Sequence, residues 1–472
     1  MNFFIKKTTT DFTSLFTSDI WLRTILQIGV NDSPLRHAIT AIGSIHFSFL
    51  QQERDVIPRA SLIPSYFALS QYGLAIQQLR QSIAQGTCHS LLALLCCAMF
   101  MLFDSFRGAS LEAIMHLSNG ARILYSLSSA EGSPGVVLDK TLLYSLRHLF
   151  MRVAIQIKFE VKDLVSDSND QASIITELGV IFDMISSSTA SLAQGHSFSS
   201  LEDARDSLNE IIIMAYANFY QSSPLYRQRD KHHWSHLRQL RFKMLANFGV
   251  WDESFAAYTN SENFLHDQKT HNAALLLRMC WQSTYNQFAI LLHTDSNGAS
   301  VLDDQAQWRF LSVRSPPSSN PVTPSTTLTT TRQPSSDNLR NLFLDHTPRF
   351  QIVLDFAEEL LGSQVPQPIE GQTPTPAVTS IHPYPSTTTA YPQAGIPEFY
   401  PDIGIISEVY ISGMLCCEML VRERAISILS RHNRREGGWD SYTCAEALKN
   451  LTIKEQDMSQ ASIIERASYG AF

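Results

Sequence analysis

Two short groups of residues have types and spacing that could do chemistry. His232 and His236 lie four positions apart, so on a helix both imidazoles would share one face, as zinc-binding histidines do. The segment Asp303-Asp304-Gln305-Ala306-Gln307 approaches the D-D-x-x-D pattern that holds magnesium on a diphosphate, but glutamine stands at its last position. Neither group is complete. We therefore interpret the histidine pair as a solvated helix face, and we expect no magnesium site at the aspartates.

The cysteines are a second place to look for reactivity. Seven occur, and two pairs are adjacent, Cys96-Cys97 and Cys416-Cys417, each inside an apolar run. Adjacent side chains on a helix point about 100° apart, so one metal rarely takes both. We interpret these cysteines as core residues, and we interpret His37 and His46 in the same way. The chain has no G-x-S-x-G, P-loop or G-x-G-x-x-G motif. We predict no enzyme, and we name no catalytic, cofactor-binding or metal-ligating residue.

Six basic residues gather near the end of the chain, at Arg422, Arg424, Arg431, His432, Arg434 and Arg435. We favour a solvated helix end, because cations stabilise the C-terminus of a helix. A nuclear-import signal is the alternative. The net charge of −8 argues against nucleic-acid binding through the overall field of the protein.

Composition sets the frame that must position these residues. The chain has 472 residues, of which 44% are hydrophobic and 17% charged. The longest apolar run, 91–103, is shorter than a membrane span needs and predicts a buried helix. An odd number of cysteines without C-x-x-C spacing fits a reducing compartment. We expect an intracellular protein that does not insert into a membrane.

Proline divides the chain. Fourteen of its 20 prolines lie in two segments rich in Ser, Thr and Pro, and we predict disorder over 315–338 and 364–401. The remaining sequence shows apolar residues at helical spacing, and no run alternates as a strand would. We predict an all-α fold with helices over 33–49, 66–81, 91–103, 109–127, 142–159, 201–220, 234–251, 270–293, 349–361, 405–430 and 441–449. The third and fourth should pair as a hairpin.

The end of the chain resembles a known family. Arg424 to Leu429 followed by Arg434-Arg435-Glu436-Gly437-Gly438-Trp439-Asp440-Ser441 is similar to the R-A-I-x-L-L and R-R-E-G-x-W-D-S segments of the regulatory region of fungal zinc-cluster transcription factors. The pattern predicts a helix end, a glycine break, a tryptophan anchor and a cap at Asp440 or Ser441. Earlier segments resemble the same region in the same order, namely Pro34–His46, Gln71–Leu79, Phe103–Leu127 and Phe198–Arg205.

The resemblance implies one large helical regulatory domain over 10–312, 339–363 and 402–455, interrupted by the two predicted insertions. It also implies a nuclear, or partly cytoplasmic, regulator of metabolic or secondary-metabolite genes. The zinc cluster of the family needs six cysteines at C-x2-C-x6-C spacing, yet no cysteine precedes Cys88 here. We therefore expect no zinc, no cofactor and no direct DNA binding. Action would go through other regulators, in a homodimer or heterodimer. A helical scaffold or a small-molecule sensor is the alternative function, and a small effector fits either reading.

Overall fold

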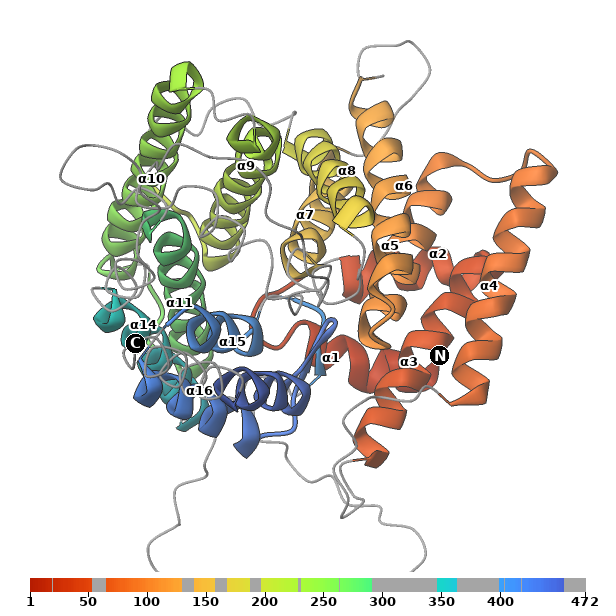
Figure 1. The fold of residues 1–472 in the computed structure, drawn as a ribbon. Coiled ribbons are helices and arrows are strands. Elements are labelled where there is room, and N and C mark those ends of the chain that lie inside the picture. The colour runs from red at the N-terminus through yellow and green to blue at the C-terminus, as the bar shows by residue number, and fades with distance from the viewer. Residues whose placement is uncertain are drawn as a thin grey trace, which may run out of the picture.

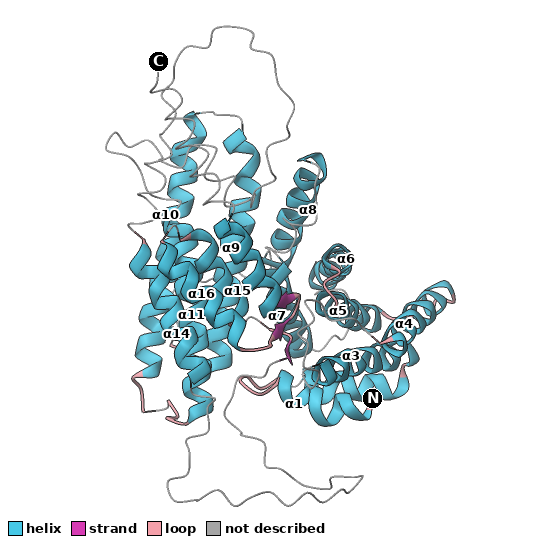
Figure 2. Ribbon diagram, turned by 60° about the horizontal axis from the view of Figure 1, so that its bottom comes forward, coloured by secondary structure: helices cyan, strands magenta, loops and turns pink. Residues whose placement is uncertain are grey.

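The computed structural model describes residues 1–18, 20–52, 65–129, 140–157, 168–186, 197–227, 231–262, 264–290, 346–362, 399–402, 404–416 and 418–453. Helices dominate these residues, and the described strands have two residues each, which confirms the all-α prediction (Figures 1 and 2). The first predicted disordered segment, 315–338, and residues 364–398 of the second lie outside the described residues.

The N-terminal half folds into a group of paired helices. Two short π-helical segments, η1 (Phe4–Thr8) and η2 (Ile20–Thr24), alternate with α1 (Thr9–Phe12) and α2 (Ile25–Asn31). The longer helices then follow in order, as α3 (Ser33–Gln52), α4 (Tyr66–Ala84), α5 (Ser90–Phe106), α6 (Ser110–Ser129), α7 (Lys140–Ile157) and α8 (Ser168–Ser186). Helix α3 packs against α4, and α5 against α6.

The second half adds helices on the other side of α7. These are α9 (Leu201–Arg227), α10 (Lys231–Thr259), α11 (Gln268–Ile290), α14 (Thr347–Gly362), α15 (Ile406–Leu415) and α16 (Met419–Arg431), followed by a helix over 441–453. Three short strands, β1 (Phe399–Tyr400), β2 (Arg435–Glu436) and β3 (Trp439–Asp440), form a small sheet. In Figure 1 the blue C-terminal helices lie beside the green ones, and the small sheet reaches toward α7.

The hairpin of α5 and α6 shows why the predicted pairing is correct. Helix α5 is apolar on every side, and nearly all of its residues from Leu92 onward are buried, as expected of a central helix. It ends at Gly108, which adopts φ +74°, a conformation that glycine takes without strain. The amide of Gly108 donates to the Ser105 carbonyl at 2.9 Å, and that of Ala109 to the Asp104 carbonyl at 2.8 Å. These two bonds close the helix as a Schellman motif.

The structure corrects several predicted boundaries. The single helix predicted over 405–430 is two helices, because the chain turns extended at Cys416 (ψ 126°). The Arg422 side chain satisfies the helix end there by donating to the carbonyls of Gly413 at 3.0 Å and Cys416 at 3.2 Å. The predicted insertion end at 401 is too late, since Phe399 and Tyr400 are buried in strand β1. Ordered structure also begins before residue 10, with Phe4 in the core.

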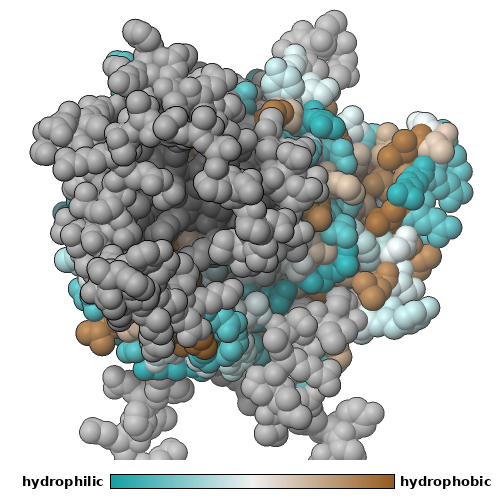
Figure 3. Space-filling view, in the orientation of Figure 1, coloured by the Kyte–Doolittle hydropathy of each residue, from teal (hydrophilic) through white to brown (hydrophobic). Residues whose placement is uncertain are grey.

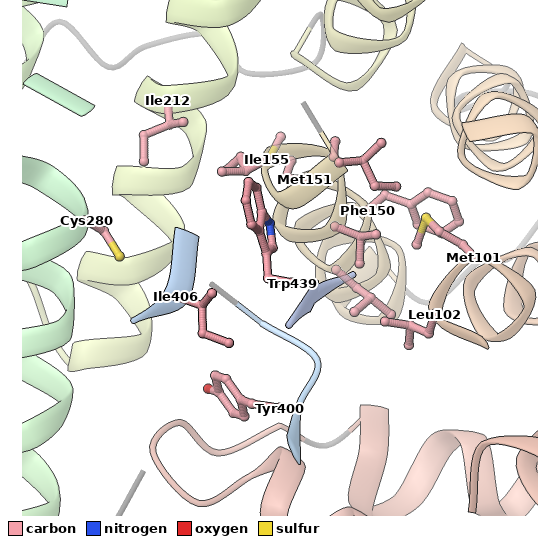
Figure 4. Close-up of a cluster of buried hydrophobic side chains, with 14 of the residues drawn as sticks. Met101, Leu102, Phe150, Met151, Ile155, Ile212, Cys280, Tyr400, Ile406 and Trp439 are labelled. Carbon is pink, nitrogen blue, oxygen red and sulfur yellow. The ribbon is translucent and has the colours of Figure 1, made fainter. Parts of the chain in front are cut away.

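One continuous apolar core runs from Phe4 to Leu448. Figure 4 shows its centre, where Phe150, Met151 and Ile155 of α7 lie near Trp439. Tyr400 and Ile406 come from the C-terminal part and enter the same cluster. Among the helices that the structure describes, none is both long enough and apolar enough to cross a bilayer.

Candidate functional site

The C-terminal motif forms a tight turn that docks on the end of α7. Strand β2 pairs with β1 in parallel and with β3 in antiparallel orientation, and the amide of Gly437 donates to the Tyr400 carbonyl at 2.9 Å. The indole of Trp439 donates to the Gln156 carbonyl at 3.2 Å. Residues 283 positions apart in the chain are thereby joined. The predicted tryptophan anchor is confirmed, and its partner is the last turn of α7.

Gly437 and Asp440 perform the two other structural roles that the motif predicts. Gly437 adopts φ +58°, and a Cβ there would lie 2.1 Å from the Gln156 side-chain oxygen, so the position needs glycine for both backbone and space. Asp440 is the helix cap, because its carboxylate accepts from the Thr443 amide at 2.8 Å. Ser441 instead accepts from the Arg434 amide at 3.1 Å and closes the turn.

Three charged side chains of the motif are buried and paired. Glu436 is 1% exposed, accepts from the Ile406 amide at 2.7 Å and lies 3.4 Å from the Arg434 guanidinium. The guanidinium of Arg435 lies 3.4 Å from the Asp440 carboxylate. Buried charges remain only when they are paired and hydrogen-bonded. The prediction of a solvated helix end is therefore wrong for Arg434 and Arg435, which face the core, and Arg422 is buried too.

A second set of buried charges joins α7, α9 and the segment after β1. Arg152 donates to Asp402 at 2.8 Å and lies 3.7 Å from Asp206. Arg205, next to Asp206 in α9, binds the same carboxylate at 2.8 Å. We name these four residues, Arg152, Arg205, Asp206 and Asp402, the junction cluster. Burial raises the pKa of Asp206, but the adjacent Arg205 cation outweighs it, so the net pKa is lowered and the carboxylate stays ionised.

His148 lies at the rim of the junction cluster. Its ring is 1% exposed and lies 3.5 Å from Glu210 and 3.9 Å from Asp206. Burial lowers the pKa of His148 to about 4 and raises the pKa of Glu210 to about 7. The histidine is therefore neutral at physiological pH, and burial sets both shifts.

An aromatic cage holds Phe399 immediately beside this cluster. The Phe399 ring stacks on His46 at 4.3 Å and on Phe106 at 4.1 Å, with Phe49 at 5.4 Å and Phe12 at 6.3 Å. Every member of the cage comes from the first 106 residues. The ring of Phe399 is 1% exposed, so it fills a socket that the N-terminal half provides.

A further polar group gathers residues of the resemblance motifs around Asp104. Tyr72 donates to the Asp104 carboxylate at 2.7 Å, Arg107 donates to it at 2.8 Å, and the His116 ring lies 3.4 Å away. These residues come from α4, the end of α5, the turn and α6. Burial lowers the pKa of His116 to about 4 and raises that of Asp104. The Asp104 group fastens three helices to one another.

The chemistry open to these groups is limited by their surroundings. Burial raises the pKa of Cys97 to about 12 and moves the pKa of Cys96 upward as well, so neither thiol is poised as a nucleophile. Within the described ranges, no group of three or more His, Cys, Asp or Glu has the arrangement of a metal site. What the paired arginines and carboxylates do is join distant segments of the chain.

The structure places the other residues considered from sequence as follows. Cys96, Cys97, Cys416 and His46 are core residues, as predicted. His46 binds the Thr8 hydroxyl at 3.0 Å, and half-buried His37 binds the Gln71 side chain at 2.7 Å. The side chains of His232 and His236, together with Asp303, Asp304 and Cys417, lie outside the described residues.

Sequence reasoning missed the residues that carry the junction. Asp402 and Phe399 sit at the edge of a Pro- and Thr-rich segment, where their burial leaves no periodic signal. A signal did exist in α7, because Arg152 interrupts an otherwise apolar run from Leu149 to Ile157. A lone arginine in such a run predicts a buried partner carboxylate.

Comparison with known proteins gives one match. Residues 1–230 match the family model described as fungal specific transcription factor domain. The match covers the N-terminal helices and most of α9, and the C-terminal motif lies beyond it. The comparisons find no matching curated protein and no matching solved structure.

Proposed function

Because residues 1–230 of this chain belong to the fungal specific transcription factor domain family, the chain is a fungal transcription regulator, and we propose that it acts through partner proteins in the nucleus. We further propose that it controls metabolic or secondary-metabolite genes. The family match is the observation that carries the proposal. The helical fold and the structural use of the motif residues support it.

The distribution of buried charge supports action through partners. Arg434 and Arg435, the most basic part of the C-terminal cluster, are buried and paired with Glu436 and Asp440. They are therefore not available to phosphate groups of DNA, which proteins contact with exposed Lys and Arg. Recruitment by another regulator would place the chain at a promoter without contact between this surface and DNA.

A tethering experiment tests the proposal. The full chain is fused to a heterologous DNA-binding domain, and a reporter with the matching site is measured in fungal cells. We expect reporter expression to change, in either direction, relative to the DNA-binding domain alone. The Phe399→Ala variant should lose the effect, because it empties the aromatic cage. The matched control is Leu420→Ala, whose side chain is 71% exposed, and it should keep the effect.

Two further measurements separate this function from a scaffold or sensor role. A fluorescent fusion should accumulate in the nucleus, and deletion of the gene should change the transcripts of a defined group of metabolic genes. An unchanged reporter together with unchanged transcripts would contradict the proposal.

A further inference from the structure

Helix α4 is an edge helix with an uncharged outer face. It packs against α3 and, at one end, against α5, and it lies at the margin of the molecule (Figures 1 and 2). Its outward residues are all exposed, namely Tyr66, Leu69, Ser70, Gly73, Gln77, Arg80 and Ala84. Arg80 is the one charged residue among its 19. Apolar surface is visible in this region of Figure 3, interspersed with polar groups. An exposed helix normally carries many more charges on its solvent face.

Gly73 lies at the centre of this face without a reason inside its own fold. Glycine in the middle of a helix weakens the helix relative to alanine. Elsewhere the structure explains such glycines, since a Cβ at Gly120 would lie 2.0 Å from the Phe150 ring. A Cβ at Gly73 would meet nothing within 4 Å. A glycine facing open space is what a close approach of a second backbone requires.

The face is self-complementary about Gly73. When two such helices cross antiparallel around a two-fold axis at this position, residues equally distant from it meet. Arg80 of one copy then faces Tyr66 of the other, and Leu69 faces Gln77. Tyr66 is 89% exposed, so its ring is free to receive the guanidinium in a cation–π contact. The same pair forms twice, as an isologous interface demands.

Charge also points to this face. Each copy carries a net charge of −8, so two copies repel each other. The outer face of α4 contains no carboxylate, and its one cation has an aromatic acceptor in the paired arrangement. Approach through α4 therefore avoids direct juxtaposition of like acidic groups.

We propose that two copies of this chain pair through α4, antiparallel, with Gly73 at the two-fold axis. The inference stands on this face alone and does not depend on the transcriptional role. A single helix of this length is about 28 Å long and covers less than the roughly 800 Å² per partner of a standard interface. The dimer is therefore weak and forms reversibly in the micromolar range or above.

Cysteine crosslinking of the full chain tests the geometry. Under mild oxidation Gly73→Cys should form a disulfide-linked dimer, because the two positions coincide at the axis. Gln81→Cys is the matched control, since it is exposed on the same helix but points about 80° away from the face. The unaltered chain reports any background from native thiols. Crosslinking of Gln81→Cys as readily as Gly73→Cys would overturn the arrangement.

Sedimentation equilibrium over about 1 to 100 µM then tests the affinity. Gly73→Leu and Arg80→Glu should each raise the dimer dissociation constant at least about tenfold, while helical content stays unchanged. Neither side chain contacts a neighbour that the substitution would displace, so both variants should fold. A chain that stays monomeric over this range and gives no Gly73→Cys crosslink overturns the proposal. The tethering result is independent of either outcome.

Discussion

Replacement of Gly120 and Gly73 by alanine should move stability in opposite directions. Both glycines lie inside long helices, and alanine adds about 1 kcal/mol of helix propensity at either one. At Gly73 the new methyl group meets nothing within 4 Å, so the whole gain should appear as stability. At Gly120 it would lie 2.0 Å from Cε1 and 2.4 Å from Cζ of Phe150.

The contact at Gly120 cannot relax cheaply. Carbon atoms pack at about 3.5–4.0 Å, so the Phe150 ring or helix α6 must move by roughly 1.5 Å. Phe150 is fully buried, and overpacking of a core costs about 1–3 kcal/mol, sometimes more. The net result should be a loss of about 2 kcal/mol for Gly120→Ala against a gain of about 1 kcal/mol for Gly73→Ala.

Urea unfolding followed by circular dichroism measures this difference of about 3 kcal/mol as a separation of midpoints at equal slope. Protein is kept at low concentration so that association does not contribute. Phe150→Leu should cost less in the Gly120→Ala background than in the unaltered chain, since the smaller side chain makes room for the methyl group. Equal stability of the two alanine variants, or an equal cost of Phe150→Leu in both backgrounds, would refute the packing argument.

Three further outcomes are expected. Phe399→Ala should destabilise the fold by about 3–5 kcal/mol, because the ring is buried among four aromatic rings, whereas Leu420→Ala should change stability by less than about 0.5 kcal/mol in the same denaturation assay. Arg152→Met should cost about 3 kcal/mol by leaving buried Asp402 unpaired, and equal stability would show that the pair contributes nothing. The pKa of His116 is 6.5 when unfolded and about 4 when folded, so the unfolded chain takes up this proton first on acidification. Stability should fall between pH 6.5 and 4 by up to about 3 kcal/mol, and His116→Gln should flatten that part of the pH profile.

The buried positions of the C-terminal motif have a consequence for mutational studies. Substitution of Glu436, Gly437 or Trp439 removes a pairing, a turn or an anchor that joins the end of the chain to α7. Loss of regulation in such variants would follow from loss of the folded domain. Variants on the outer face of α4 leave these contacts intact and are better suited to separate partner binding from folding.

The sequence by itself determined the helices and the local turns. Apolar spacing marked α3 to α7 correctly, because each of these helices buries one or more faces and period is a local property. The turn chemistry of Gly437 and the cap at Asp440 were equally predictable, since a positive φ and an orphan amide are satisfied within a few residues. The burial of the cysteine doublets followed from their apolar neighbours.

Only the tertiary structure decided which charges are buried and which segments meet. Arg434 and Arg435 look like an exposed basic cluster in one dimension, and only the long-range approach of the turn to α7 turns them inward. Phe399 shows the same limit, because its socket is built from residues about 300 to 400 positions earlier in the chain. Pairings of this kind depend on the folded arrangement as a whole, since no local pattern encodes a partner so distant in sequence.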